Sequence, residues 1–307
     1  MIRKPAVAGM FYEEAKEGLI SEIEQCFMGS LGPGMLPETK GKHRGDLLGL
    51  VCPHAGYIYS GSAAAYSYRA MADDGLPDVV VILGPNHYGL GPAVSISAVD
   101  KWETPLGILN VDIELAHEIE QLSQYAQCDN LAHSREHSIE VQLPFLQYIA
   151  GDNIKIVPIS IAYLNEANAG MVVSDLGAAI AKALEGRRAV VIASTDFTHQ
   201  ESKASAQIKD SAAIDEILKL DDEGLLRVVY GRSISMCGAV GTAIMIKTCK
   251  TLGATRAQKL TYYTSGDVIG NTDEVVGYSA ISLSRNIYRL YCLRALACSK
   301  LLRAPSS

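Results

Sequence analysis

Four short runs of almost uninterrupted apolar residues stand out along the chain, and longer segments with helical periodicity lie between them. The apolar runs cover residues 47–52, 79–84, 154–161 and 187–194. Helical spacing of apolar residues covers 61–73, 112–127, 138–150, 166–185 and 203–220. Strands buried on both faces have such continuous apolar runs, because neither side meets water. The alternation therefore predicts an α/β fold with a mostly parallel or mixed central sheet flanked by helices.

Two further segments have the pattern of paired strands. Residues 91–112 and 259–283 each contain two strand-like runs, and turn-forming residues at Gly270–Asp273 divide the second segment. No internal repeat or linker interrupts the chain before its final segment. We therefore predict a single domain over residues 1–284.

The final segment, residues 285–307, differs in charge from the rest of the chain. It has no acidic residue, and its basic residues are Arg285, Arg289, Arg294, Lys300 and Arg303. Its leucines fall near one face of a helix, which predicts a basic C-terminal helical tail. Such a helix would pack on its own domain or on a second subunit of a homo-oligomer.

The composition narrows the class of protein. Of the 307 residues, 48% are hydrophobic, which is enough for a large core, and the formal net charge is −7. This charge, without a basic stripe before the tail, argues against nucleic acid as a partner. No apolar run approaches the roughly 20 residues that span a bilayer. The seven cysteines show no CxxC spacing. We expect a cytoplasmic protein with free thiols, whose partner is a small molecule of unknown identity.

Three of the apolar runs end in a histidine. The stretches "LLGLVCPHAGY", "VVVILGPNH" and "AVVIASTDFTH" lead to His54, His87 and His199, and the last also contains Asp196. Ligands of α/β proteins bind beyond the carboxyl ends of the strands. These four side chains are therefore predicted to line one crevice, whereas His117 is expected on a helix face.

Cys237 lies at the start of a predicted helix over residues 238–250, with Ser233 or Ser235 as its cap. The positive end of the helix dipole favours a thiolate, so a lowered pKa is expected for Cys237. A thiolate binds metal or attacks carbon. The alternative is a small buried apolar residue, a role that is common for free cysteines.

The segment "HSREHSIEVQLPFL" formally matches the H-x-x-E-H pattern of zinc peptidases at His133, Glu136 and His137. That pattern requires both histidines on one helical face. Here the helix is predicted to begin at Ser138, so that His133 precedes it. We therefore expect His137 and Glu140 to face the crevice, where they contact substrate or orient a ligand histidine.

Five motifs carry a resemblance to a known family. They are, in chain order, "CPHAGYIYSG", "ILGPNH", "EHSIEVQLPFL", "STDFTH" and "SMCG". From residue 4 to about residue 284, the chain resembles the Memo family, whose bacterial and archaeal members are also called AmmeMemoRadiSam system protein B. The family is similar in fold to the LigB-type class III extradiol dioxygenases, which hold a non-haem iron with two histidines and a glutamate.

The resemblance implies a metal-facing cluster of His54, His87 and Cys237. In this cluster the cysteine stands where the dioxygenases have their carboxylate. A thiolate in place of a carboxylate softens the site, so Fe(II) or Cu is the expected metal, with Zn(II) as the alternative.

The same resemblance implies roles for three further residues. Asp196 and His199 would line the metal pocket, with His199 where the dioxygenases place an acid/base histidine, and His137 would face the substrate. These residues fit a metal-dependent redox enzyme that acts on a small molecule. Two alternatives stay open: a non-catalytic metal-binding or interaction protein, and a metal-free hydrolase or transferase with Cys237 as nucleophile.

Overall fold

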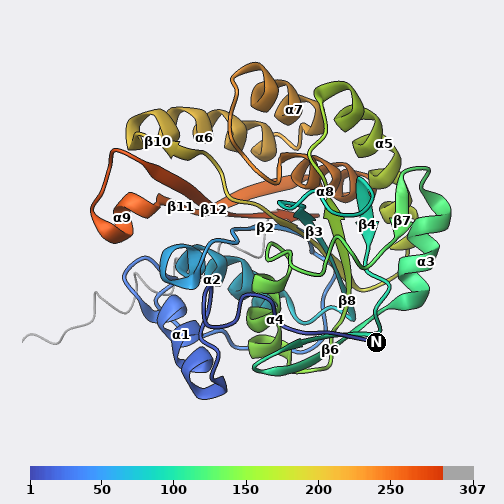
Figure 1. Cartoon of the computed structure of the whole chain (residues 1–307), viewed down its shortest axis with the longest axis horizontal. Coiled ribbons are helices and arrows are strands. Elements are labelled where there is room, and N and C mark those ends of the chain that lie inside the picture. Colours follow the sequence, from blue (N-terminus) through green and yellow to red (C-terminus); the bar gives the residue numbers. More distant parts are fainter. Residues whose placement is uncertain (286–307) are drawn as a thin grey trace, which may run out of the picture.

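The structure, a computed structural model, describes residues 1–285. A sheet crosses the middle of the protein, and helices cover both of its faces (Figure 1). The predicted tail helix, apart from Arg285, lies outside the described residues. Among the helices of residues 1–285, none has both the length and the apolar character to cross a membrane.

Strands and helices alternate along most of the chain, as the sequence pattern predicts. The strands are β1(Ile2–Arg3), β2(Leu47–Cys52), β3(Val79–Pro85), β4(Val94–Ile96), β5(Lys101–Thr104), β6(Gly107–Val111), β7(Ala126–Cys128), β8(Lys155–Ile161), β9(Ala189–Ser194), β10(His199–Glu201), β11(Arg256–Thr264) and β12(Val275–Ser284). The helices are α1(Lys16–Met28), α2(Tyr57–Asp74), α3(Ile113–Leu122), the 3-10 turn η1(Glu140–Gln142), α4(Leu143–Ala150), α5(Glu166–Ala183), α6(Lys203–Leu218), α7(Asp222–Gly231), α8(Ala239–Thr251) and α9(Ser265–Ile269).

The structure confirms the four predicted buried strands as β2, β3, β8 and β9. Two predicted helices are shorter than expected. The helix predicted over 112–127 ends as α3 at Leu122, where the chain turns into β7. The helix predicted over 138–150 begins with η1, and α4 follows with Pro144 in its first turn, where proline is well tolerated. Apolar spacing did not predict α7 or β10.

The sheet is mixed, as predicted, and its strand order is β1-β5-β6-β8-β3-β9-β2-β12-β10. At its centre β8, β3, β9 and β2 are parallel to one another. Their carboxyl ends therefore lie at the same edge of the sheet. β12 runs antiparallel to β2 and also pairs with β11.

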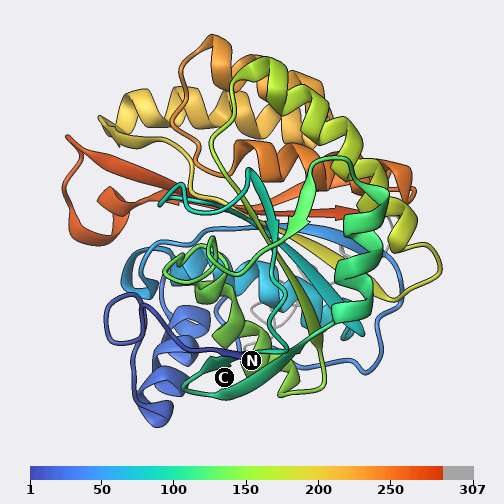
Figure 2. The ribbon, with the colours of Figure 1, turned by 45° about the vertical axis from the view of Figure 1, so that its right-hand side comes forward.

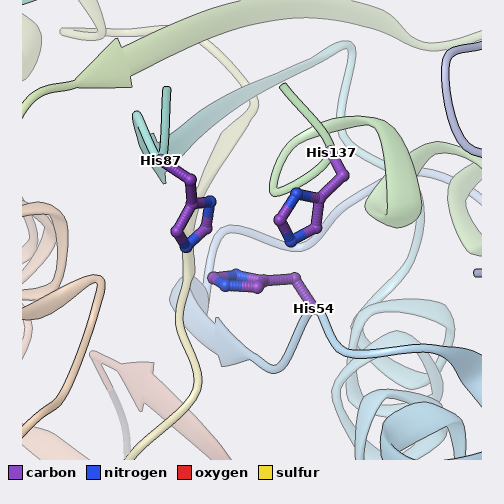
Figure 3. Close-up of side chains that lie close together, drawn as sticks. All are labelled: His54, His87 and His137. Carbon is purple, nitrogen blue, oxygen red and sulfur yellow. The ribbon is translucent and has the colours of Figure 1, made fainter. Parts of the chain in front are cut away.

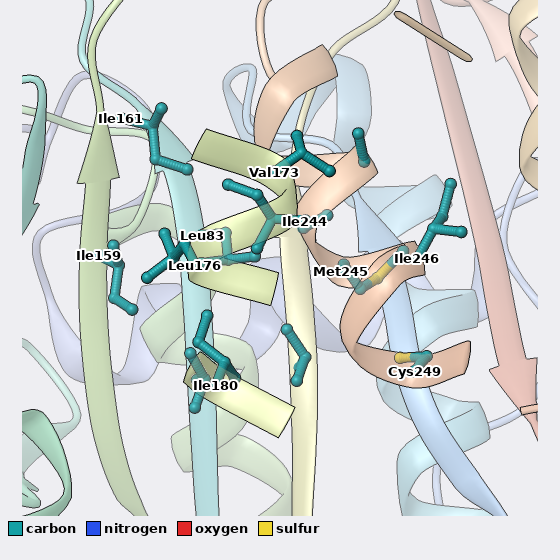
Figure 4. Close-up of a cluster of buried hydrophobic side chains, with 14 of the residues drawn as sticks. Leu83, Ile159, Ile161, Val173, Leu176, Ile180, Ile244, Met245, Ile246 and Cys249 are labelled. Atoms are coloured by element: carbon teal, nitrogen blue, oxygen red, sulfur yellow. The ribbon is translucent and has the colours of Figure 1, made fainter. Parts of the chain in front are cut away.

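The central strands place alternate residues in two separate apolar cores. In β3, Val79, Val81 and Leu83 belong to the core under α5 and α8, part of which Figure 4 shows. Val80 and Ile82 belong to the core under α1, α2 and α4. Figure 2 shows these two helical layers from another side. Because both faces are covered, the strands have few polar residues, which accounts for the nearly continuous apolar runs.

β1 ties the start of the chain to the segment that precedes η1. The Arg3 guanidinium forms a buried ion pair with Glu140. It also donates hydrogen bonds to the carbonyl oxygens of His133 and Glu136, at 3.1 and 2.7 Å. The guanidinium carbon lies over the Trp102 ring, 4.4 Å from its centroid. Arg3 therefore fixes both ends of the segment 133–140.

We expect Arg3→Leu to lower the free energy of unfolding by about 3–5 kcal/mol, because it leaves the Glu140 carboxylate buried without its charged partner. Urea unfolding followed by circular dichroism measures the change. Lys4→Leu is the matched control, since the Lys4–Glu103 ion pair is largely exposed and its loss should change stability by less than about 1 kcal/mol. Equal losses in the two variants would contradict the importance of the buried pair.

Candidate metal site

Three histidine side chains converge beyond the carboxyl ends of the central strands (Figure 3). His54 follows β2, His87 follows β3, and His137 precedes η1. One ligand nitrogen of each ring lies within 4.8 Å of the other two. The His87 and His137 rings are nearly parallel, with centroids 4.6 Å apart, and the His54 ring meets both edge to face.

Two glycines allow the segments around this group to approach closely. A Cβ atom at Gly84, in β3, would lie 2.6 Å from Oγ of Ser138. A Cβ atom at Gly238, directly before α8, would lie 2.5 Å from the carbonyl oxygen of Ser194. Any side chain at these positions would separate β3 from the segment that carries His137, or α8 from β9.

The carboxylate of Glu136 holds two of the three histidines in place. It accepts hydrogen bonds from Nδ1 of His87 at 2.9 Å and from the backbone N–H groups of His87, His137 and Ser138. Burial alone would raise the pKa of Glu136, but the hydrogen bonds and the interaction with His87 lower it to about 2. Because a carboxylate only accepts, His87 carries its proton on Nδ1, and the lone pair on Nε2 is available to a metal.

A serine hydroxyl orients His54 in the same way. Oγ of Ser194 donates to the carbonyl oxygen of Ser138 at 2.6 Å and accepts from Nε2 of Gln142 at 2.7 Å. Its only proton is therefore committed, so at its 3.0 Å contact with Nδ1 of His54 the hydroxyl must accept. His54 consequently carries its proton on Nδ1 and has its lone pair on Nε2.

The environment keeps the imidazoles of His54 and His137 neutral. Burial, followed by the nearby His137 and His87, holds the pKa of His54 well below its usual range. Burial likewise lowers the pKa of His137 to about 4. Neutral imidazole nitrogens are common ligands of iron, copper and zinc. The donor set therefore fits a metal ion of this class.

Cys237 lies beside the histidine group, next to His54. Its Sγ atom is 3.3 Å from Nε2 of His54 and accepts a hydrogen bond from the backbone N–H of Asp196. His137, rather than Cys237, completes the group of mutually close ligand atoms.

The expected fall in the pKa of Cys237 is wrong. Burial and the charge of Asp196 raise this pKa to about 12. Cys237 does precede α8, but desolvation outweighs the positive end of the helix dipole.

Asp196 and His199 both follow the end of β9. Oδ1 of Asp196 accepts a hydrogen bond from the backbone N–H of His54 at 2.9 Å, and burial raises the pKa of this carboxyl group. His199 begins β10, and its Nδ1 is 2.9 Å from the carbonyl oxygen of Ser235. A carbonyl only accepts, so Nδ1 of His199 donates there.

The expectation that Glu140 faces the crevice is also wrong. Its carboxylate accepts hydrogen bonds from Arg3, from the backbone N–H groups of Ala6 and Val7, and from the Tyr12 hydroxyl. The N-terminal segment therefore covers Glu140, and this residue supports the fold rather than the site.

The H-x-x-E-H pattern does not form a two-histidine site. His133 is buried, and its Nε2 lies 3.1 Å from the carbonyl oxygen of Ser95, outside the histidine group. The sequence suggested Glu136 only as part of the H-x-x-E-H pattern, and not as the residue that orients His87. It did not suggest Ser194, which orients His54. The signal for Glu136 was its place directly before His137, since carboxylates commonly orient ligand histidines. Ser194 gives no comparable signal.

A cavity of about 560 Å³ adjoins the cluster, and His87 and Cys237 form part of its wall. The rest of the wall comes from the ends of β3 and β8 and from the connection between α7 and α8. Apolar side chains such as Ile161, Leu164 and Met236 contribute much of the lining. This volume and lining suit a small, largely apolar molecule.

Known proteins of one family are similar to this chain over most of its length. The family described as Memo-like protein matches residues 3–282. A MEMO1 family protein of Methanopyrus kandleri is 46% identical over 285 residues, which cover 93% of this chain and 100% of the relative. A MEMO1 family protein of Pyrobaculum aerophilum is 47% identical over 286 residues, covering 92% and 99%. One from Nitrosopumilus maritimus is 42% identical over 281 residues, again covering 92% and 99%.

The hydrogen-bond network predicts which ring nitrogen carries the proton. In chelator-treated protein at neutral pH, we expect the proton on Nδ1 in His54 and His87, because both face groups that can only accept there. Long-range ¹H–¹⁵N correlation spectra of labelled protein identify the tautomers. Ser194→Ala should release His54 into a mixture of tautomers and leave His87 unchanged, as an internal control. A proton on Nε2 of His87 would contradict the role of Glu136.

Proposed function

Because the chain belongs to the Memo family, we propose that it is a metal-dependent redox enzyme that acts on a small molecule. Fe(II) or Cu is the proposed metal, with Zn(II) as the alternative. The observation that carries this proposal is that ligand nitrogens of His54 and His87 lie within 4.8 Å of each other, with the Cys237 thiol 3.3 Å from Nε2 of His54 and with His137 close by. Neutral imidazole, which has a lone pair to offer, is the form of histidine that binds metal.

We propose His54, His87 and Cys237 as the protein ligands of the metal. A nitrogen and a sulfur bound to one tetrahedral metal lie roughly 3.5 Å apart, given metal–ligand distances of about 2.0–2.1 and 2.3 Å. The separation between Nε2 of His54 and Sγ of Cys237 is 3.3 Å. A cation there would displace the thiol proton. His137 would then face the molecule bound next to the metal.

The other residues supply binding and proton transfer. Fe(II) or Cu supplies one-electron redox chemistry when bound. The cavity beside His87 and Cys237 would hold a small apolar molecule and keep water away from it. His199 would take a proton on Nε2 as general base, while its Nδ1 stays bonded to the Ser235 carbonyl oxygen. Asp196 would keep the backbone of His54 in place.

We expect His54→Ala and His87→Ala to abolish iron binding, and Cys237→Ser to weaken it at least about tenfold, since each removes a ligand. Iron per chain is measured after anaerobic loading with Fe(II) and desalting. His137→Ala should keep its iron, and His43→Ala is the control for the loss of a buried histidine outside the cluster. If His137→Ala loses iron while Cys237→Ser keeps it, the proposed ligand set is wrong.

We expect His199→Gln to lower kcat by about 10²–10⁴-fold without changing the iron content, because it removes the proton acceptor but no ligand. Oxygen consumption by the iron-loaded protein with a panel of catechols measures the rate. The exposed neighbour Gln200, changed to alanine, is the control. Full iron content without oxygen consumption for any member of the panel would contradict the redox proposal and favour a non-catalytic metal-binding protein.

A further inference from the structure

A second group of metal-binding side chains lies outside the histidine cluster. His117 and Glu120 are about one turn apart on α3, and Cys128 ends β7, which packs beside α3 (Figure 1). One ligand atom of each residue lies within 4.8 Å of the other two. None of the three residues takes part in the site described above. Their proximity therefore needs an explanation of its own.

Two of the three separations within this group are close to the edges of a coordination tetrahedron. Nδ1 of His117 lies 3.6 Å from Sγ of Cys128 and 3.1 Å from Oε2 of Glu120. Zinc–ligand distances of about 2.3 Å to sulfur and about 2.0–2.2 Å to nitrogen or oxygen give edges of roughly 3.5 and 3.4 Å. The third separation, between Sγ of Cys128 and a carboxylate oxygen of Glu120, is within 4.8 Å, so one cation could contact all three atoms after the side chains adjust.

The scaffold holds these ligands in place. Oε1 of Glu120 accepts a hydrogen bond from the backbone N–H of Cys128 at 2.6 Å, so the carboxylate joins helix and strand while Oε2 stays turned toward His117. The turn between the two elements is also fixed, because the Ser123 hydroxyl donates to Asp175 of α5. Ligands oriented by a second set of contacts bind metal more tightly than free side chains.

We propose that His117, Glu120 and Cys128 form a surface site for Zn(II), with water as the fourth ligand. One nitrogen, one oxygen and one sulfur suit this borderline-soft ion, whereas Mg²⁺ and Ca²⁺ take oxygen ligands. The His117 side chain is 52% exposed and that of Glu120 32%. The ion therefore reaches the site directly from solvent.

Binding is coupled to the release of one proton. Burial, followed by the hydrogen bond and charge of Glu120, raises the pKa of Cys128 to about 12. The thiol is therefore protonated at neutral pH, and one zinc–sulfur bond forms as one proton passes to solvent. The ion then links α3 to β7 through its own ligands.

The test uses the full chain with Cys237→Ser, so that the thiol beside the histidine cluster is absent. The chelator-treated protein is titrated with Co(II), which gives a sulfur-to-cobalt charge-transfer absorption only with a thiolate ligand. We expect Co(II) to produce this absorption and Zn(II) to remove it. Adding Cys128→Ser should abolish the absorption, whereas adding Cys26→Ser, a buried cysteine elsewhere, should leave it unchanged.

His117→Gln provides a second variant at an exposed position, where folding is not at stake. It should weaken Co(II) binding at least about tenfold. An absorption that survives Cys128→Ser, or none in the parent protein, would overturn the proposed site. Because every variant lacks Cys237, these results are independent of iron binding at His54 and His87.

Discussion

The geometry of the histidine cluster depends on the hydrogen bonds that the buried carboxylate of Glu136 accepts. A charged carboxylate in the interior is unfavourable unless several donors surround it. Here the donors are the ring of His87 and the backbone of His87 and His137, the same groups that must be positioned. Arg3 extends this constraint, because it binds the carbonyl oxygen of Glu136 and so joins β1 to the cluster. β1, the segment around Glu136 and the ring of His87 are thus parts of one hydrogen-bond network.

Much of the fold could be predicted because the central strands are recognisable without their partners. β3 and β9 are apolar on both faces, so their sequences indicate burial wherever they pair. α7 escaped prediction because its apolar residues, such as Leu225 and Val229, occupy a short stretch between two longer helices. β10 has three residues, and it pairs with β12 more than seventy residues further along the chain. Such an element depends on tertiary contacts that no local pattern contains.

The candidate site, like the fold, could be predicted from the sequence only in part. His54 and His87 could be found because each directly follows a buried strand. The closeness of His137 depends on how the loop 133–140 lies against Gly84, and this follows from packing. The pKa of Cys237 was misjudged because the helix dipole can be inferred from sequence, whereas the degree of desolvation cannot. Glu140 was misplaced because its partners come from the first residues of the chain.

The pairing of β2 with β12 has a consequence for biosynthesis. β2 carries His54 at its end, and one of its edges pairs with β12, where Val51 lies opposite Ile281. A ribosome makes β2 early and β12 last among the described strands, so that edge has no partner during most of translation. An apolar strand with an open edge is prone to mispairing. This edge of β2, the strand that leads to His54, therefore stays open to mispairing until residues 275–284 have been made.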